Sequence, residues 1–293
     1  MFSGCYVATI TPFSSNGKEI DEIALKNLLE FLISAGVAGV VPCGSTGESA
    51  TLSHEEHERV IALTVKYVNQ RVKVVAGTGS NNTAEAIKLT EFARKAGCDG
   101  ALLISPYYNK PTQEGLYRHF RQVSESVDIP IMLYNIPGRT AVNIEPETIA
   151  RLVQDCPNII AIKEASGNLE QMARIKMLAP RLDLLSGDDA LTLPLLAIGG
   201  VGVVSVLANI APRPVVEMLA SWETNDRARA QEIYYQYLPL IKALFIETNP
   251  IPVKTAAGLM GLCQPDLRLP LCPMSEKNRQ VLTNILREYQ LIK

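Results

Sequence analysis

The sequence predicts an α/β protein, a (β/α)8 barrel followed by a helical segment. Eight short, β-branched apolar runs alternate with longer amphipathic stretches, which indicates βα units with parallel strands. The apolar runs are continuous, as expected for strands that are buried on both faces. Eight units within roughly 210 residues favour a closed barrel. An open, doubly wound sheet is the alternative, but no Gly-x-Gly-x-x-Gly fingerprint follows the first run.

The predicted elements follow one another with clear start and stop signals. The strands are predicted at residues 6–10, 37–42, 73–77, 100–104, 129–134, 159–163, 182–186 and 202–207. Helices are predicted between the first strands at 21–35, 53–69 and 83–96. Ser53 with Glu56 forms a capping box, and Thr83 opens the third helix. Gly36 and Gly97 mark helix ends.

The pattern changes after about residue 224, where only helical segments follow. They are predicted at 226–247, with an interruption at Pro239, at 252–260 and at 275–292. We therefore predict two domains, a barrel over residues 1–224 and a helical domain over residues 225–293.

Composition limits the classes of partner. The net charge is −2, so neither a nucleic-acid surface nor a polybasic lipid-binding segment is expected. No apolar run approaches the ~20 residues that span a bilayer, and the N-terminus lacks a signal-peptide pattern. The six cysteines are scattered singly and are interpreted as reduced thiols. We expect a cytoplasmic protein without a membrane or nucleic-acid partner.

Lys163 is the strongest candidate for a catalytic residue. It ends the sixth predicted strand, and the active sites of such barrels lie at the carboxyl ends of the strands. Burial lowers the pKa of an amine, which makes it a nucleophile towards carbonyl groups. Alternatively, the side chain reaches solvent or pairs with Glu164. Strand alternation places Glu164 on the opposite face, which argues against the pair.

The neighbouring strand end carries Tyr134. A phenol at this position can pass protons to and from a carbinolamine. The alternative is a core ring whose hydroxyl is satisfied, and for Tyr134 considered alone this is the stronger interpretation. The second strand is followed by Ser45 and Thr46 between Gly44 and Gly47. Glycines allow a close backbone approach, and hydroxyls with free amides suit a carboxylate, although a plain turn is the alternative.

Two further groups of polar residues have competing interpretations. Arg139 follows a Pro-Gly turn and can bind a carboxylate with two hydrogen bonds, unless it is a solvated loop residue. His54 and His57 lie three residues apart, which differs from the four-residue spacing of zinc proteases. We therefore predict no metal site. His119 lies in an amphipathic stretch and is interpreted as structural.

Taken together, six motifs resemble the dihydrodipicolinate synthase family of pyruvate-dependent class I aldolases, within the N-acetylneuraminate lyase superfamily. They are GSTGES (44–49), PYYNKP (106–111), YNIPGRT (134–140), IKEA (162–165), SGDD (186–189) and NPIPVK (249–254). The resemblance spans nearly the whole chain. The family condenses pyruvate with L-aspartate-4-semialdehyde in the diaminopimelate route to lysine, and the resemblance implies this activity without a cofactor.

The resemblance implies four catalytic residues. Lys163 forms a Schiff base with pyruvate, and Tyr134 donates and accepts protons. Ser45 links Tyr134 to Tyr108, which reaches in from a neighbouring subunit. Ser45 stands where threonine is common in the family, but it keeps the hydroxyl.

The resemblance also implies substrate-binding residues. Thr46 holds the pyruvate carboxylate and Arg139 meets the carboxylate of the aldehyde. Gly187 lines the pyruvate pocket, and Val204 contacts pyruvate through its main chain. Val204 stands where isoleucine is common.

Some members of the family are inhibited by lysine at a cleft between subunits. The matching positions are Ser49, Ala50, His54, His57, Asn81, Glu85 and Tyr107. Lysine feedback is therefore a hypothesis. Because Tyr108 acts across an interface, we expect a homo-oligomer with the dimer as the minimal active unit, assembled into a homotetramer as a dimer of dimers.

Three alternative functions stay open at this point. N-acetylneuraminate lyases and keto-deoxy-sugar-acid aldolases share the hydroxyls, the tyrosine and the lysine, but sugar-acid members usually lack the arginine at position 139. A non-catalytic regulatory barrel is the third alternative, and it has no need for a buried amine.

Overall fold

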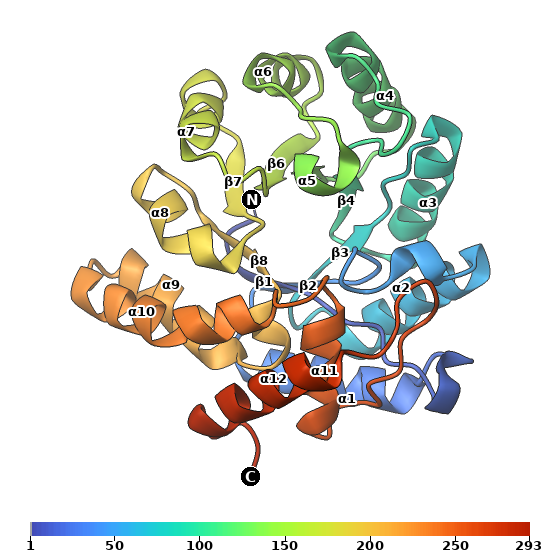
Figure 1. Cartoon of the computed structure of the whole chain (residues 1–293). Helices are drawn as coiled ribbons and strands as arrows, with labels where there is room; N and C mark the ends of the chain where they lie inside the picture. Colours follow the sequence, from blue (N-terminus) through green and yellow to red (C-terminus); the bar gives the residue numbers. More distant parts are fainter. Residues whose placement is uncertain (1) are drawn as a thin grey trace. The chain divides into compact units, whose positions relative to one another are not determined.

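The computed structural model describes residues 2–293 and confirms the predicted fold class (Figure 1). Eight strands follow one another in a closed barrel in the order of the chain. The pair β1–β2 and the pairs from β3 through β8 are parallel. The strands are β1 (Gly4–Ala8), β2 (Gly39–Val41), β3 (Lys73–Gly77), β4 (Gly100–Ile104), β5 (Ile131–Asn135), β6 (Ile159–Glu164), β7 (Asp183–Ser186) and β8 (Gly202–Ser205).

Helices alternate with the strands, and the first three of them begin and end close to the predicted residues. The helices are α1 (Glu22–Ser34), α2 (His54–Val68), α3 (Thr83–Ala96), α4 (Gln113–Ser126), α5 (Pro137–Thr140), α6 (Pro146–Asp155), α7 (Leu169–Leu178), α8 (Thr192–Ala197) and α9 (Pro212–Glu223). The capping box of Ser53 and Glu56 is confirmed. Thr83 opens α3 as predicted, and Asn82 caps the helix because its side chain accepts from the amides of Ala84 and Glu85.

Three helices follow α9, namely α10 (Arg227–Ala243), α11 (Ile251–Leu259) and α12 (Glu276–Glu288). The predicted interruption at Pro239 is wrong, because α10 continues through it. Helix α10 packs against α9 and α12, and it buries Ile233 and Leu240. This packing outweighs the hydrogen bond that a proline removes from a helix interior.

The chain divides into two compact units. The first comprises residues 73–204 together with the N-terminal residues up to Gly4, and the second comprises residues 5–72 and 205–293. The predicted domain boundary near residue 224 stays a prediction. Among residues 2–293, no helix combines the length and the apolarity that crossing a bilayer requires.

The core of the first unit determines which way Lys163 points. Strand residues Leu133, Ile162 and Leu184 pack in one apolar cluster with Phe120 of α4 and Ile175 of α7. Ile162 thus faces the helices, and successive residues of a strand face opposite sides. Lys163 therefore faces the barrel interior, whereas Glu164 faces the helices.

Candidate active site

The first part of the site surrounds Lys163 on β6. Its side chain is buried, with a residue exposure of 6%. Strand register pairs Lys163 with Tyr134 on β5. The Lys163 Nζ lies 4.1 Å from the centroid of the Tyr134 ring, and Tyr134 is itself buried. The structure therefore brings together the two residues that the sequence placed at adjacent strand ends.

Burial lowers the pKa of Lys163 to about 7, the nearby charge of Asp189 raises it, and that of Arg139 lowers it. A large fraction of the amine is therefore neutral near pH 7, as a nucleophile towards a carbonyl requires. The interpretation of Lys163 as a solvent-reaching residue is wrong, because the side chain is buried.

Glu164 does not balance the charge of Lys163, because it belongs to a separate buried network. Its carboxylate accepts hydrogen bonds from the Ser166 amide at 2.6 Å and the Asn135 Nδ2 at 2.9 Å. The Gln171 Nε2 donates to it at 3.3 Å. Burial raises the pKa of Glu164, although these hydrogen bonds lower it. Strand alternation thus predicted the direction of this side chain correctly.

Gly187, Arg139 and Val204 lie in the same unit as Lys163. A Cβ at Gly187 would stand 3.1 Å from the Lys163 Cε and 2.7 Å from the Ala165 Cβ, so only glycine leaves room beside the amine. Arg139 is exposed on α5, directly after β5, and its charge acts on Lys163. Val204 is buried on β8.

Ser45 and Thr46 belong to the second unit, in the loop that follows β2. Backbone hydrogen bonds from Gly47 to Gly44 and from Glu48 to Ser45 fold this loop into tight turns. A Cβ at Gly47 would stand 3.0 Å from the Thr9 carbonyl oxygen. Thr46 is buried, and its hydroxyl accepts a hydrogen bond of 3.0 Å from the Asn249 Nδ2.

Tyr108 lies in the loop after β4 and projects outward. Its exposure is 89%, and its backbone has a φ of 72°. Tyr107 is 39% exposed, and its carbonyl accepts from the Asn81 Nδ2 at 3.1 Å. The structure thus joins two of the residues at the predicted lysine positions, Asn81 and Tyr107.

The other predicted lysine positions are divided between the two units. Glu85 bonds to Ser80 in the first unit. In the second unit, His54 is exposed and His57 is buried on α2, and Ser49 and Ala50 precede them in a 3-10 turn. No group of three or more His, Cys, Asp or Glu residues within residues 2–293 is arranged to hold a metal ion.

His119 has the buried environment of a structural residue. Its Nδ1 lies 2.9 Å from the Thr83 Oγ1, and burial lowers the pKa of the imidazole to about 4. A neutral imidazole that bonds to a neighbouring helix fits the structural interpretation.

Sequence reasoning missed Asn249, which bonds to Thr46, and Lys254, which pairs with Glu48. Asn249 and Lys254 belong to the last of the six motifs, and the sequence alone predicted no role for either of them. Lys254 lies in the apolar helix α11 and is 0% exposed. An amine within an apolar run is the signal that singled out Lys163, and it would also have identified Lys254.

The chain is similar to known proteins over nearly its whole length. The model of the dihydrodipicolinate synthetase family matches residues 1–289. The 4-hydroxy-tetrahydrodipicolinate synthase of Endomicrobium trichonymphae is 56% identical over 293 residues, which cover 100% of both chains. The structure of dihydrodipicolinate synthase from Aquifex aeolicus is 50% identical, covers 99% of each chain and superposes with a TM-score of 0.97. A synthase from Cyanidioschyzon merolae, solved with lysine bound, is 42% identical over 99% of each chain with a TM-score of 0.96.

These matches confirm the resemblance inferred from the six motifs, and they extend over the barrel and the C-terminal helices alike. Full-length identity above one half to a curated synthase supports the same class of lyase activity for this protein. The chain belongs to the dihydrodipicolinate synthetase family.

Proposed function

We propose that the protein is a lyase that condenses pyruvate with L-aspartate-4-semialdehyde to form 4-hydroxy-tetrahydrodipicolinate, in the diaminopimelate route to lysine. The observation that carries this proposal is the buried amine of Lys163, with a pKa of about 7, beside Tyr134. The substrates are soluble metabolites, and we place the protein in the cytoplasm.

The reaction begins with the neutral amine of Lys163. Its nitrogen lone pair attacks the carbonyl carbon of pyruvate and forms a carbinolamine. Tyr134 donates a proton to the departing hydroxyl, water leaves, and an iminium remains. The Tyr134 phenolate then accepts a methyl proton from the iminium, which becomes an enamine, the carbon nucleophile for the second substrate. The short distance between the amine and the phenol ring supports this division of roles.

Binding residues hold pyruvate so that only its carbonyl reacts. Thr46 donates a hydrogen bond to the carboxylate, and the main chain of Val204 contacts the substrate. Gly187 leaves space beside the amine, and the Lys163 and Ala165 side chains that crowd the place where a Cβ would stand support this role. Ser45 connects Tyr134 to Tyr108 of a neighbouring subunit, so protons are exchanged with solvent along a chain of hydroxyls.

Arg139 selects the second substrate. Its guanidinium binds the carboxylate of the aldehyde with two hydrogen bonds and orients the aldehyde carbon towards the enamine. The exposed position of Arg139 on α5 supports a role for a substrate that arrives after pyruvate. This arginine favours aspartate semialdehyde over the neutral sugar aldehydes of the related lyases.

The test of the function is an assay of pyruvate consumption with different aldehydes. We expect turnover with aspartate-4-semialdehyde and little or none with N-acetylmannosamine or glyceraldehyde, because only the first carries a carboxylate for Arg139. Preference for a sugar aldehyde would identify one of the related lyases. Absence of turnover with every aldehyde, together with absence of a pyruvate adduct, would indicate a non-catalytic barrel.

The same assay with added lysine tests feedback. The proposed site consists of Ser49, Ala50, His54, His57, Asn81, Glu85 and Tyr107, which offer a carboxylate and polar groups to a zwitterion. The hydrogen bond between Asn81 and the Tyr107 carbonyl supports a preformed surface on one side of this site. We expect the rate to fall as lysine reaches millimolar concentration, and a flat curve would contradict feedback.

The proposed active form is a homotetramer built as a dimer of dimers, in which Tyr108 completes the site of its partner. The large exposure and left-handed backbone of Tyr108 support a contact outside its own chain. Mixing Lys163→Met subunits with Tyr108→Phe subunits should restore activity, because a mixed dimer contains one site with both native groups.

A matched control uses two residues that serve the same site from the same subunit. Mixing Lys163→Met with Tyr134→Phe subunits should restore nothing, because every site then lacks one of the two groups. Restoration in this control, or a fully active monomer in sedimentation, would contradict the proposed contribution of Tyr108.

A further inference from the structure

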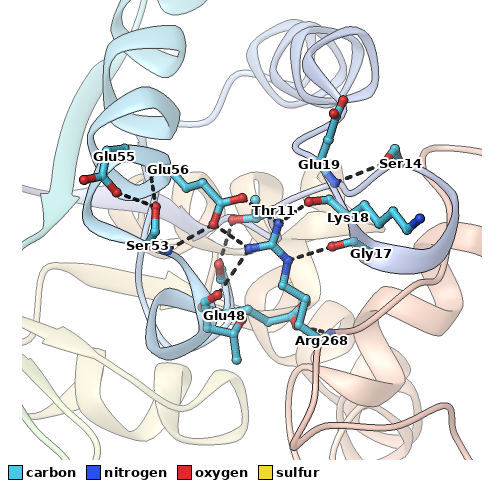
Figure 2. Close-up of polar contacts among 12 residues, drawn as sticks. Thr11, Ser14, Gly17, Lys18, Glu19, Glu48, Ser53, Glu55, Glu56 and Arg268 are labelled. Carbon is cyan, nitrogen blue, oxygen red and sulfur yellow. Dashed lines mark hydrogen bonds and ion pairs between the residues drawn. The ribbon is translucent and has the colours of Figure 1, made fainter.

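An ion cluster lies beside the loop that carries Thr46, and it consists of Glu48 and Lys254, which are buried, and Glu56 and Arg268, which are partly exposed. The Lys254 Nζ lies 2.5 Å from the Glu48 Oε1, and both side chains are 0% exposed. The Arg268 amide donates to the Glu48 Oε2 at 3.1 Å, so both carboxylate oxygens are bound. The Arg268 guanidinium bonds to both oxygens of Glu56 at 2.6 Å (Figure 2).

Arg268 ties the cluster to its surroundings. Figure 2 shows its guanidinium between Glu56 and the backbone of Gly17 and Lys18, and hydrogen bonds of 2.7 and 3.0 Å reach those two carbonyl oxygens. The ring of Phe13 lies under both cations, 3.9 Å from the Lys254 Nζ and 4.2 Å from the Arg268 Cζ. The cluster is therefore fully satisfied by hydrogen bonds and aromatic contact.

Stability alone gives no reason for such a cluster. Removing two charges from water costs about as much as their attraction returns, and apolar residues of the same size often stabilise a fold equally well. Burial lowers the pKa of Lys254, and the charge of Glu48 opposes that shift. A buried ion pair instead fixes the geometry around it. If either partner moves away, an uncompensated charge is left buried, which costs free energy of folding.

The ion pair fixes the geometry of the loop from Gly44 to Glu48. Glu48 has a left-handed backbone with a φ of 55°, and its side chain is held by Lys254. Two residues earlier in the loop, the Thr46 hydroxyl accepts from Asn249, which lies two residues before α11, the helix that carries Lys254. The Thr11 hydroxyl adds a hydrogen bond of 2.7 Å to the Gly47 carbonyl oxygen between them. The loop is thus held at three consecutive residues.

The hydrogen bond from Asn249 also orients the Thr46 proton. A threonine hydroxyl has one hydrogen to donate and lone pairs that accept. Because the Asn249 Nδ2 occupies a lone pair, the hydroxyl hydrogen is directed elsewhere and is available to a carboxylate. The same contact made by an acceptor would draw that hydrogen towards residue 249 instead.

We propose that Asn249, Lys254 and Glu48 are positioning residues that fix the Thr46 hydroxyl as a donor to the carboxylate of the keto acid substrate. This inference rests on the proposed role of Thr46 in pyruvate binding. Asn249 sets the direction of the hydroxyl hydrogen, and the ion pair of Glu48 with Lys254 sets the position of the loop.

The test measures the pyruvate concentration that gives half-maximal trapping of the borohydride-reduced adduct. Asn249→Ala should raise this half-maximal concentration about tenfold, which is the effect of one lost hydrogen bond near a charged ligand. Asn249→Asp keeps the size of the side chain but replaces the donor by an acceptor, and it should raise the concentration further. Thr46→Val should match or exceed Asn249→Ala. Maximal trapping at saturating pyruvate should stay near that of the native protein in the two Asn249 variants.

A double variant separates positioning from general damage. In the Thr46→Val background, Asn249→Ala should cause no further rise, because the hydroxyl that it orients is already absent. If the half-maximal pyruvate concentration of the double variant rises by the product of the two single effects, the proposal is overturned. An Asn249→Asp protein that binds pyruvate like the native one would also overturn it. If the Asn249→Ala protein does not fold, Asn249→Asp with Thr46→Val forms the same cycle.

The ion pair is tested by removing both charges together, because loss of one charge strands the other. Glu48→Gln with Lys254→Met should fold and should raise the half-maximal pyruvate concentration severalfold. The matched control is Lys176→Met, which removes a half-buried lysine of the first unit that donates to the Pro180 and Leu182 carbonyls. It should leave pyruvate binding unchanged. If the double charge variant needs the same pyruvate concentration as the native protein, the role of the ion pair is overturned. If the native protein itself traps no pyruvate, the proposed function is overturned.

Discussion

Replacing Lys163 by methionine should abolish the reducible pyruvate adduct and lower turnover on the order of a thousandfold or more, because no other group supplies the covalent step. Methionine has a similar length and no charge, so it fits the buried site. The adduct is measured as added mass on the peptide that carries residue 163 after treatment with pyruvate and borohydride. A native protein that is labelled on a different lysine would contradict this role.

The pH dependence of trapping gives an independent view of the same amine. Only the neutral form attacks the carbonyl, so the trapping rate should rise with pH and reach its midpoint near the Lys163 pKa of about 7. A midpoint near 10, the ordinary range of lysine, would show that the amine is not desolvated during the reaction.

The Lys163→Met protein should also unfold at a higher temperature than the native one. The folded-state pKa of about 7 lies below the unfolded value near 10.5, so below pH 7 both states bind the proton and the full cost of burying the ammonium is present. Native stability rises with pH between these values as the folded state releases the proton. Methionine removes this cost, and its advantage should be largest at or below pH 7.

Replacing Arg139 by alanine should lower kcat/KM for aspartate semialdehyde about a hundredfold and leave the pyruvate adduct intact. The loss corresponds to two charge-assisted hydrogen bonds to the carboxylate of the second substrate. Steady-state kinetics with the aldehyde and borohydride trapping with pyruvate measure the two effects separately. Equal loss in both measurements would mean that Arg139 has a structural role.

Two further readouts sharpen the test of Arg139. The Arg139→Lys protein keeps the charge but not the paired geometry, so it should recover only part of the activity. Because the Arg139 charge lowers the pKa of Lys163, the midpoint of pyruvate trapping should shift to higher pH in Arg139→Ala and stay in place in Arg139→Lys.

The strand ends explain why so much of the first part of the site was predictable. Lys163 and Tyr134 lie in short parallel strands whose order follows the chain, so neighbouring strand ends in the sequence are neighbours in space. Alternation along β6 was enough to separate Lys163 from Glu164. The desolvation that sets the Lys163 pKa then follows from the apolar residues around it.

Helix caps and helix interruptions were less predictable than the order of the strands. The start of α3 at Thr83 was predicted, but only the structure shows that the Asn82 side chain caps this helix. Pro239 was expected to interrupt a helix on local grounds, and tertiary packing of α10 decided otherwise.

The sequence by itself determined the strand and helix pattern, the buried amine of Lys163 and its tyrosine neighbour, because these depend on periodicity and on strands that are adjacent in the chain. Only the tertiary structure decided the partners of Thr46 and Glu48, because Asn249 lies 203 residues from the first and Lys254 lies 206 residues from the second. No local pattern encodes a contact over such a separation, since it depends on how distant segments pack. The charges of Glu48 and Lys254 make their contact specific, because a buried charge without its partner is too costly to keep.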